Sequence, residues 1–230
     1  MTENITGFTL LELFELGGIT MWPLLFFSIV AVAIVLERVI YLLYHNLRLD
    51  DLKEKVEIAI KNNQLEEVKK FLESKTNRRM GARILLTLVK RSGLSEQRLE
   101  KAVEAEALSC ISSLENGFNF LTALGSISPL TGFLGTVTGM IGAFRSIAEA
   151  ADVNAQIVAS GIYEALITTV FGLVIAILAM TAHSLFTHIV DRFASQVEVV
   201  CSDLIIALAE SRGTAESVSA ASVLPDKEVK

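Results

Sequence analysis

Residues 124–143 read LGSISPLTGFLGTVTGMIGA, and residues 164–180 read EALITTVFGLVIAILAM. Both stretches lie in runs that contain no Asp, Glu, Lys or Arg, from Asn116 to Phe144 and from Ala165 to Val190. Each run exceeds the roughly 20 residues that a helix needs to cross a bilayer core. The two stretches therefore predict two transmembrane helices.

Small and hydroxyl-bearing residues recur in both runs at steps of three or four, which places them along one face of each helix. Such faces let membrane helices approach closely, so we expect them to be packing surfaces. If these faces also bordered a pore, their smoothness would let one assembly turn against another. The expected helix-packing residues are Gly132, Gly135, Gly139, Gly172 and Ala176.

Composition and charge narrow the class of protein. Of the 230 residues, 52% are hydrophobic and 20% are charged, so the charges must be segregated from the spans. The net charge of −6 and the lack of a basic stripe argue against a nucleic-acid-binding protein. Cys110 and Cys201 stand far apart without metal-ligand spacing, so we expect neither a disulfide nor a metal site.

A further apolar run, residues 18–44, predicts a third span near the N-terminus. The following residues 45–115 hold 14 of the 20 Lys and Arg residues, whereas residues 1–37 and 146–163 hold none. By the positive-inside rule, residues 45–115 and the C-terminus are cytoplasmic, and the N-terminus and residues 148–161 lie on the opposite side of the membrane.

The sequence thus predicts an all-α, polytopic membrane protein whose second and third spans extend into a cytoplasmic helical region. An alternative for the first segment is that it extends the first span. The expected segments are a periplasmic amphipathic N-terminus at 1–17, transmembrane helix 1 at 18–44, a cytoplasmic helical loop at 45–115, transmembrane helix 2 at 116–147, a short periplasmic loop at 148–161, transmembrane helix 3 at 162–190, a cytoplasmic helix at 191–211 and a disordered tail at 212–230.

Within the loop, the spacing of apolar residues predicts short helices at 50–62, 64–73 and 83–91. Ser95 is a suitable N-cap for a further helix. No helix breaker follows until the second span, so we expect one continuous rod. Pro129 removes a backbone hydrogen bond from that rod and should kink it.

The spans carry too few reactive groups for an enzyme. No acid, base or histidine lies between Asn116 and Phe144, and the third span offers only Glu164 at its outer end and His183 towards its inner end. A catalytic triad or a metal centre needs several converging groups, and no phosphate-binding loop is present. We therefore expect no catalysis and no cofactor, and any energy source must be external.

Three threonines are candidates for the lining of a pore. The hydroxyls of Thr136, Thr168 and Thr169 can donate and accept hydrogen bonds, so they could orient water or bind a carboxylate from another chain. Thr169 lies on the small-residue face and is the better candidate than Thr168. The alternative is a structural role, in which each hydroxyl bonds back to a carbonyl of its own helix.

The segments GFLGTVTGMIGAF (132–144) and EALITTVFGLVIAI (164–177) closely resemble the signature segments of the ExbB/TolQ/MotA proton-channel family. Three spans with a large loop after the first resemble its ExbB and TolQ branch. The resemblance implies a homo-oligomeric ring, usually a pentamer, around two copies of an ExbD/TolR-like single-span partner that carries a membrane Asp.

Proton flow past that Asp would convert the proton-motive force into mechanical work on the cell envelope, for outer-membrane transport or envelope integrity. A TonB/TolA-like third component would receive the work, and membrane lipids would surround the ring.

The same resemblance implies roles for three residues. Thr136 and Thr169 would line the central pore and face the partner's Asp. Glu164 would stand at the outer end of the third span, where it would help proton entry or hold the ring together. Protons are the implied ion, although hydroxyls also coordinate sodium.

Two other functions remain open at this stage. A flagellar-stator-like channel subunit of the same superfamily would normally carry four spans, whereas this chain predicts three. A non-transporting membrane scaffold would use the small-residue faces only to assemble helices, and it would tolerate the loss of the threonine hydroxyls.

Overall fold

The structure is a computed structural model, and it describes residues 10–62, 64–149 and 155–222. Every secondary-structure element in these ranges is an α-helix, so the predicted all-α class is confirmed for them. They are α1 (Leu10–Leu16), α2 (Met21–Tyr44), α3 (Asp50–Lys61), α4 (Leu65–Lys75), α5 (Met80–Lys90), α6 (Glu96–Glu115), α7 (Phe118–Glu149) and α8 (Ala155–Ser222).

Three helical stretches are long and apolar enough to cross a membrane, namely Met21–Tyr44, Glu96–Glu149 and Val158–Gly213. The second and third stretches contain the predicted spans 116–147 and 162–190, and the first lies within the predicted span 18–44. Such lengths exceed what an apolar bilayer core requires. The chain is therefore a multi-pass membrane protein.

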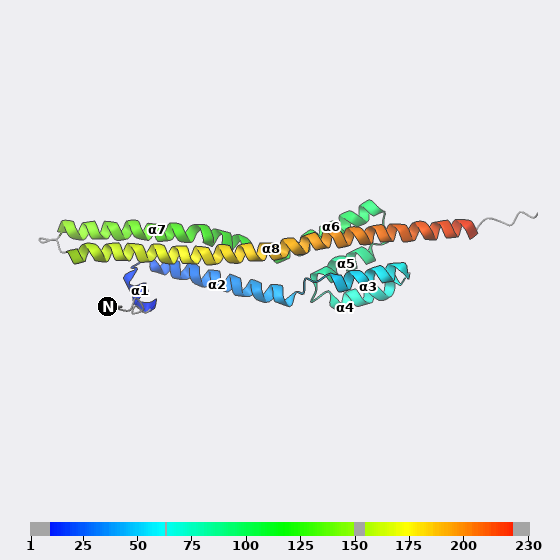
Figure 1. Ribbon diagram of the computed structural model, residues 1–230, viewed down its shortest axis with the longest axis horizontal. Coiled ribbons are helices and arrows are strands. Elements are labelled where there is room, and N and C mark those ends of the chain that lie inside the picture. Colours follow the sequence, from blue (N-terminus) through cyan, green and yellow to red (C-terminus); the bar gives the residue numbers. More distant parts are fainter. Residues whose placement is uncertain (1–9, 63, 150–154, 223–230) are drawn as a thin grey trace, which may run out of the picture. The chain divides into compact units, whose positions relative to one another are not determined.

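The chain divides into two compact units. The membrane unit comprises Met1–Val39 and Gly117–Thr187, and the polar unit comprises Ile40–Asn116 and His188–Lys230. In the membrane unit, α7 and α8 run side by side (Figure 1). The buried side chains of Ala31 from α2, Leu124 from α7 and Ala179 from α8 form one cluster, so all three spans share a core.

The turn between α1 and α2 makes α1 a separate short helix. Gly18 has a backbone φ of +66°, a conformation that side-chain-bearing residues rarely adopt. The rings of Phe14 and Trp22 pack edge to face across the turn, with 5.4 Å between centroids. The alternative that the N-terminal segment extends the first span is therefore wrong for residues 10–16, while residues 1–9 lie outside the described residues.

The predicted continuous rod from Glu96 into the second span is also wrong. Helix α6 ends at Glu115 and α7 begins at Phe118, because Gly117 has a φ of +89° that no α-helix can contain. The guanidinium of Arg38 lies over this break, and its Nε would be 3.3 Å from a β-carbon added at Gly117. Arg38 also pairs with Glu37 at 2.7 Å.

Helix α7 continues through Pro129. The neighbouring hydroxyls bond to their own helix, as Ser126 donates to the Thr122 carbonyl at 3.1 Å and Thr131 to the Ile127 carbonyl at 3.0 Å. These bonds satisfy the hydroxyls inside an apolar environment. The kink at Pro129 stays a prediction.

Helix α8 is longer than the sequence analysis predicted at both ends. Residues 155–161, expected in a loop, and residues 212–222, expected in a disordered tail, are helical. The physical reason is that no proline interrupts the chain between Ala155 and Ser222, and alanine and glutamate favour helix. Residues 150–154 and 223–230 lie outside the described residues.

In the polar unit, the observed α3 and α4 match the predicted helices closely, α5 begins three residues earlier, at Met80, and α6 begins at the predicted Glu96. Ser95 occupies the N-cap position of α6, although its side chain makes no capping bond. Helix α5 is the core of this unit because most of its residues are buried. These are Met80, Gly81, Ala82, Ile84, Leu85, Leu86, Leu88 and Val89.

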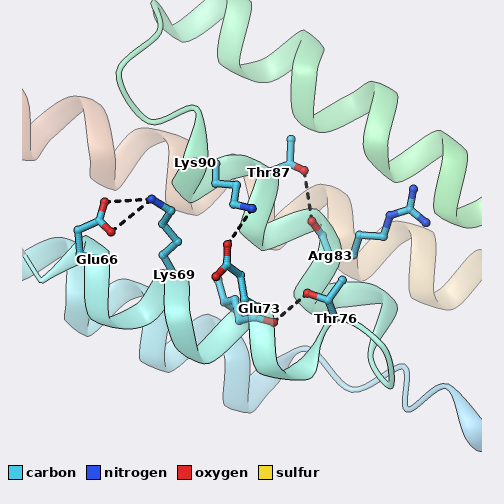
Figure 2. A network of polar contacts seen from close by, with 8 residues as sticks. Glu66, Lys69, Glu73, Thr76, Arg83, Thr87 and Lys90 are labelled. Atoms are coloured by element: carbon cyan, nitrogen blue, oxygen red, sulfur yellow. Dashed lines mark hydrogen bonds and ion pairs between the residues drawn. The ribbon is translucent and has the colours of Figure 1, made fainter.

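Ion pairs join the helices of the polar unit at its surface. Lys90 of α5 pairs with Glu73 of α4 at 2.8 Å, as Figure 2 shows, and this hydrogen bond lowers the pKa of the Glu73 carboxyl. Lys53 of α3 donates to Asp203 of α8 at 2.6 Å, which raises the pKa of Lys53. Because these side chains are open to solvent, the pairs orient the helices more than they stabilise them.

The burial of α5 makes a prediction about stability. Replacing Leu85, which is fully buried, by alanine leaves a cavity and should lower the free energy of unfolding by about 2–5 kcal/mol. Ile58 is half exposed, so Ile58→Ala should cost much less. Thermal unfolding of the detergent-purified chains, followed by circular dichroism, makes the comparison. Equal shifts in the two variants would show that α5 is not the core.

Candidate functional site

The backbones of α7 and α8 meet at two glycines. A β-carbon added at Gly132 would lie 2.8 Å from the carbonyl oxygen of Thr168, and one added at Gly172 would lie 2.6 Å from that of Ser128. Real β-carbons do not approach other atoms so closely. The contact between the two helices therefore requires glycine at both positions.

Three helices converge one turn further along α7, at Gly135. A β-carbon there would collide with the Thr168 hydroxyl of α8 and would lie 2.9 Å from the Thr20 hydroxyl next to α2. The Thr20 hydroxyl donates to the carbonyl of Gly17 at 3.3 Å. The turn before the first span thus reaches the interface of the second and third spans.

The hydroxyls of Thr168 and Thr169 point to the same atom of α7. Thr168 Oγ1 lies 2.8 Å from the Ala165 carbonyl and 3.3 Å from the Gly132 carbonyl, and Thr169 Oγ1 lies 3.4 Å from the latter. Thr168 is fully buried, whereas Thr169 is only half-buried. Of the two, Thr169 is the one that a group outside this chain can reach.

Thr136 lies one helical turn after Gly132 and is also half-buried. Its hydroxyl donates to the Phe133 carbonyl of its own helix at 2.6 Å, which leaves its oxygen lone pairs as acceptors. Thr136 and Thr169 thus stand on neighbouring helices beside the same glycine, with part of each surface uncovered. A donor from a second chain could bond to either oxygen.

The small-residue faces lie against each other within this single chain. Gly132, Gly135, Gly139, Gly172 and Ala176 are all buried, and a β-carbon at Gly139 would lie 3.1 Å from the Gly161 carbonyl. The expectation that these faces let one assembly turn against another is therefore wrong. The cause is that α7 and α8 cover each other's smooth faces, so a second chain would meet other residues.

Glu164 stands near the start of α8, against the turn that precedes the first span. A β-carbon at Gly18 would collide with its carboxylate oxygen and would lie 2.9 Å from its carboxyl carbon. Glu164 is half-buried there. The structure brings Glu164 to the Gly17–Gly18 turn. Gly172, which contacts Gly132, lies more than one helical turn further along α8.

Sequence reasoning missed the contribution of this turn. Gly18 gives room to Glu164, and Thr20 contacts the α7–α8 interface. The adjacent pair Gly17–Gly18, directly before an apolar run, is the signal that could have indicated a tight turn. Nothing in the sequence shows which carboxylate the turn would meet.

Other reactive groups are few among the described residues. Cys110 and Cys201 are buried free thiols, and burial raises the pKa of Cys201 to about 12, so this thiol is unreactive near neutral pH. Within the described ranges, no group of three or more His, Cys, Asp or Glu residues could hold a metal ion.

The chain is similar in sequence to known membrane proteins. Residues 42–199 match the sequence pattern of the MotA/TolQ/ExbB proton channel family. The chain is 32% identical over 206 residues to the putative biopolymer transport protein ExbB-like 1 of Synechocystis sp., covering 83% of this chain and 78% of that protein.

Two further relatives match over shorter segments. The biopolymer transport protein ExbB of Salmonella typhimurium is 33% identical over 109 residues, which are 47% of this chain and 43% of that protein. The Tol-Pal system protein TolQ of Haemophilus influenzae is 46% identical over 74 residues, which are 32% of each. The chain is thus similar to proteins of both the ExbB and the TolQ type.

The glycine contact can be tested with a matched control. Gly132→Ala and Gly172→Ala should each push α7 from α8 and lower the free energy of unfolding by about 1–3 kcal/mol. Gly142→Ala should not, because nothing lies within 4 Å of a β-carbon at Gly142. Unfolding in mixed micelles of increasing denaturing-detergent content measures the difference. A loss at Gly142 equal to that at Gly172 would contradict the close contact.

Proposed function

Because the chain belongs to the MotA/TolQ/ExbB proton channel family, we propose that it is the channel subunit of an ExbB- or TolQ-type energiser in the bacterial inner membrane. Such a subunit converts the proton-motive force into work on the cell envelope, in outer-membrane transport or in envelope integrity. The observation that carries the proposal is the pair of half-buried threonines, Thr136 and Thr169, beside the α7–α8 contact.

The spans lack an acid in their middle, since Glu37 and His183 lie towards the inner ends of the first and third spans. No acid, base or histidine lies between Asn116 and Phe144, and Glu164 stands at the end of the third span. The carrier therefore comes from another chain, an ExbD/TolR-like protein with one span and a membrane Asp. The oxygens of Thr136 and Thr169 can accept a hydrogen bond from that carboxyl group when it is protonated. To bond to its ionised form, each hydroxyl must turn its proton away from the Phe133 or the Gly132 carbonyl.

The energetics suit a stepwise motor. A potential of about 100 mV supplies about 2.3 kcal/mol for each proton that crosses the membrane. This energy is enough to bias a conformational step if the partner's Asp takes a proton from one side and releases it to the other. Burial in an apolar pore raises the pKa of a carboxyl group, and hydrogen bonds from threonine lower it again, so both forms become accessible.

The assembly that fits this function is a ring, a homopentamer around two copies of the partner. The N-terminus is periplasmic, residues 45–115 are cytoplasmic, and the C-terminus is cytoplasmic. Glu164 then stands at the periplasmic end of the third span, where it helps protons to enter or holds the ring together. A TonB/TolA-like protein would take up the work.

The threonine pair is the direct test of the proton path. Thr136→Val and Thr169→Val keep the volume and remove the hydroxyls, so proton flux in proteoliposomes that contain the partner should fall at least about tenfold. Thr138→Val is the matched control, because Thr138 is exposed on another face of α7 and donates to the carbonyls of Leu134 and Gly135. Unchanged flux in both pore variants would show that the two hydroxyls lie outside the proton path, whereas a wild-type complex without flux above background would favour a non-transporting scaffold.

The native mass of the purified complex tests the assembly. We expect a ring that retains a small single-span, Asp-bearing protein when the chain is expressed with the membrane protein encoded beside it. Mass spectrometry from detergent or nanodiscs gives the number of copies. A stable ring that never binds such a partner would leave the proton carrier without a source, and the scaffold function would then be preferred.

A further inference from the structure

A cleft in the polar unit joins two segments that are far apart in the sequence. It has a volume of about 410 Å³ and lies between the segment that links α2 to α3 and one stretch of α8. Leu47, Ile189 and Phe193 supply its apolar part. Arg48, His188 and Arg192 supply nitrogen-bearing side chains on the same cleft.

The two arginines of the cleft are the groups that can bind an anion. Within residues 10–62, 64–149 and 155–222, no carboxylate forms an ion pair with the guanidinium of Arg48 or Arg192. Both side chains are exposed, so the fork of each guanidinium is open to an anion. One planar guanidinium group can donate two parallel hydrogen bonds to two oxygens of the same phosphate. A phosphate is therefore the anion that two arginines on one cleft suit best.

The cleft follows directly on the ends of two spans. Helix α2 ends at Tyr44, three residues before Leu47, and the third predicted span ends at Val190, between Ile189 and Arg192. Residues that flank the ends of spans in this way lie at the depth of lipid headgroups. An apolar floor beside two cations matches the boundary between an acyl chain and a phosphate group.

The remaining groups of the cleft limit the charge of the ligand. Asp50 lies on it as the first residue of α3, so the two arginines and this carboxylate together carry a formal charge of +1. That balance suits a phosphodiester with a single negative charge better than a polyphosphate. The Gln196 amide and the Asp50 carboxylate can bond to hydroxyl groups on such a headgroup.

We propose that this cleft binds the phosphodiester headgroup of an anionic phospholipid, of the phosphatidylglycerol type, at the cytoplasmic face of the membrane. Arg48 and Arg192 hold the phosphate from two sides, and Leu47, Ile189 and Phe193 contact the first part of the acyl chains. The bound lipid would tie the end of the first span to the end of the third. Binding requires the spans but no proton transport. A failed lipid test therefore leaves the proposed channel function untouched, and a failed test of proton flux leaves the lipid site untouched.

The test measures lipid binding to the full-length chain in detergent by native mass spectrometry. The probes are phosphatidylglycerol and phosphatidylcholine with identical acyl chains. Wild-type protein should prefer phosphatidylglycerol by about tenfold or more, since each basic residue near an anionic lipid contributes roughly fivefold. The double variant R48Q/R192Q should lose this preference.

A matched control separates the cleft from the overall charge. The double variant R91Q/R98Q removes two exposed arginines elsewhere in the same unit, so it should keep the preference. If both double variants lose it equally, general electrostatic attraction explains the binding and the site is wrong. The single variant R192K keeps the charge without the planar fork and should lose only part of the preference for phosphatidylglycerol. If R48Q/R192Q fails to fold, R192K tests the site in its place, and an unchanged preference in R192K would contradict it.

A second arm identifies the source of the phosphate. Glycerol 3-phosphate and inorganic phosphate are added as soluble competitors against phosphatidylglycerol. Displacement of the lipid only at millimolar concentrations supports a lipid site, because the apolar floor then contributes to affinity. Displacement at the concentration of the lipid itself would show a site for soluble phosphate and overturn the lipid assignment.

Discussion

The close approach of α7 and α8 at Gly132 and Gly172 is the constraint on which the membrane unit depends. Lipid chains are as apolar as leucine, so burial of apolar surface gives two membrane helices little reason to associate. Dispersion contacts and hydrogen bonds must hold them together, and both grow as the backbones approach. Glycine at the two contact points allows an approach that any side chain would prevent.

That contact also decides what each threonine can do. Because α7 lies so near, its Gly132 carbonyl comes within reach of the hydroxyls of Thr168 and Thr169. Thr168 is enclosed by the contact and serves the structure, whereas Thr169 stands at its edge with part of its surface open. Polar groups in an apolar membrane interior must be satisfied, so only a hydroxyl at such an edge is available for a second chain.

The polar unit obeys a different rule. Water can satisfy its surface, so its helices carry exposed ion pairs of small energetic value around one buried helix, α5. Arg48 and Arg192, which form no ion pair with any of the described residues, line one cleft where the chain leaves two spans. The boundary between membrane and water thus carries a cleft whose two arginines outnumber its single carboxylate, that of Asp50.

The sequence by itself determined the all-α class, the three spans, the positions of α3 and α4 in the polar unit and the threonines worth considering. Each of these depends on local preference or on periodicity, which neighbours along the chain reveal. Only the tertiary structure decided that Gly117 breaks the rod, that the Gly17–Gly18 turn receives Glu164, and that the small-residue faces cover each other. Periodicity shows which face of a helix is buried, but the partner that buries it depends on how distant segments pack.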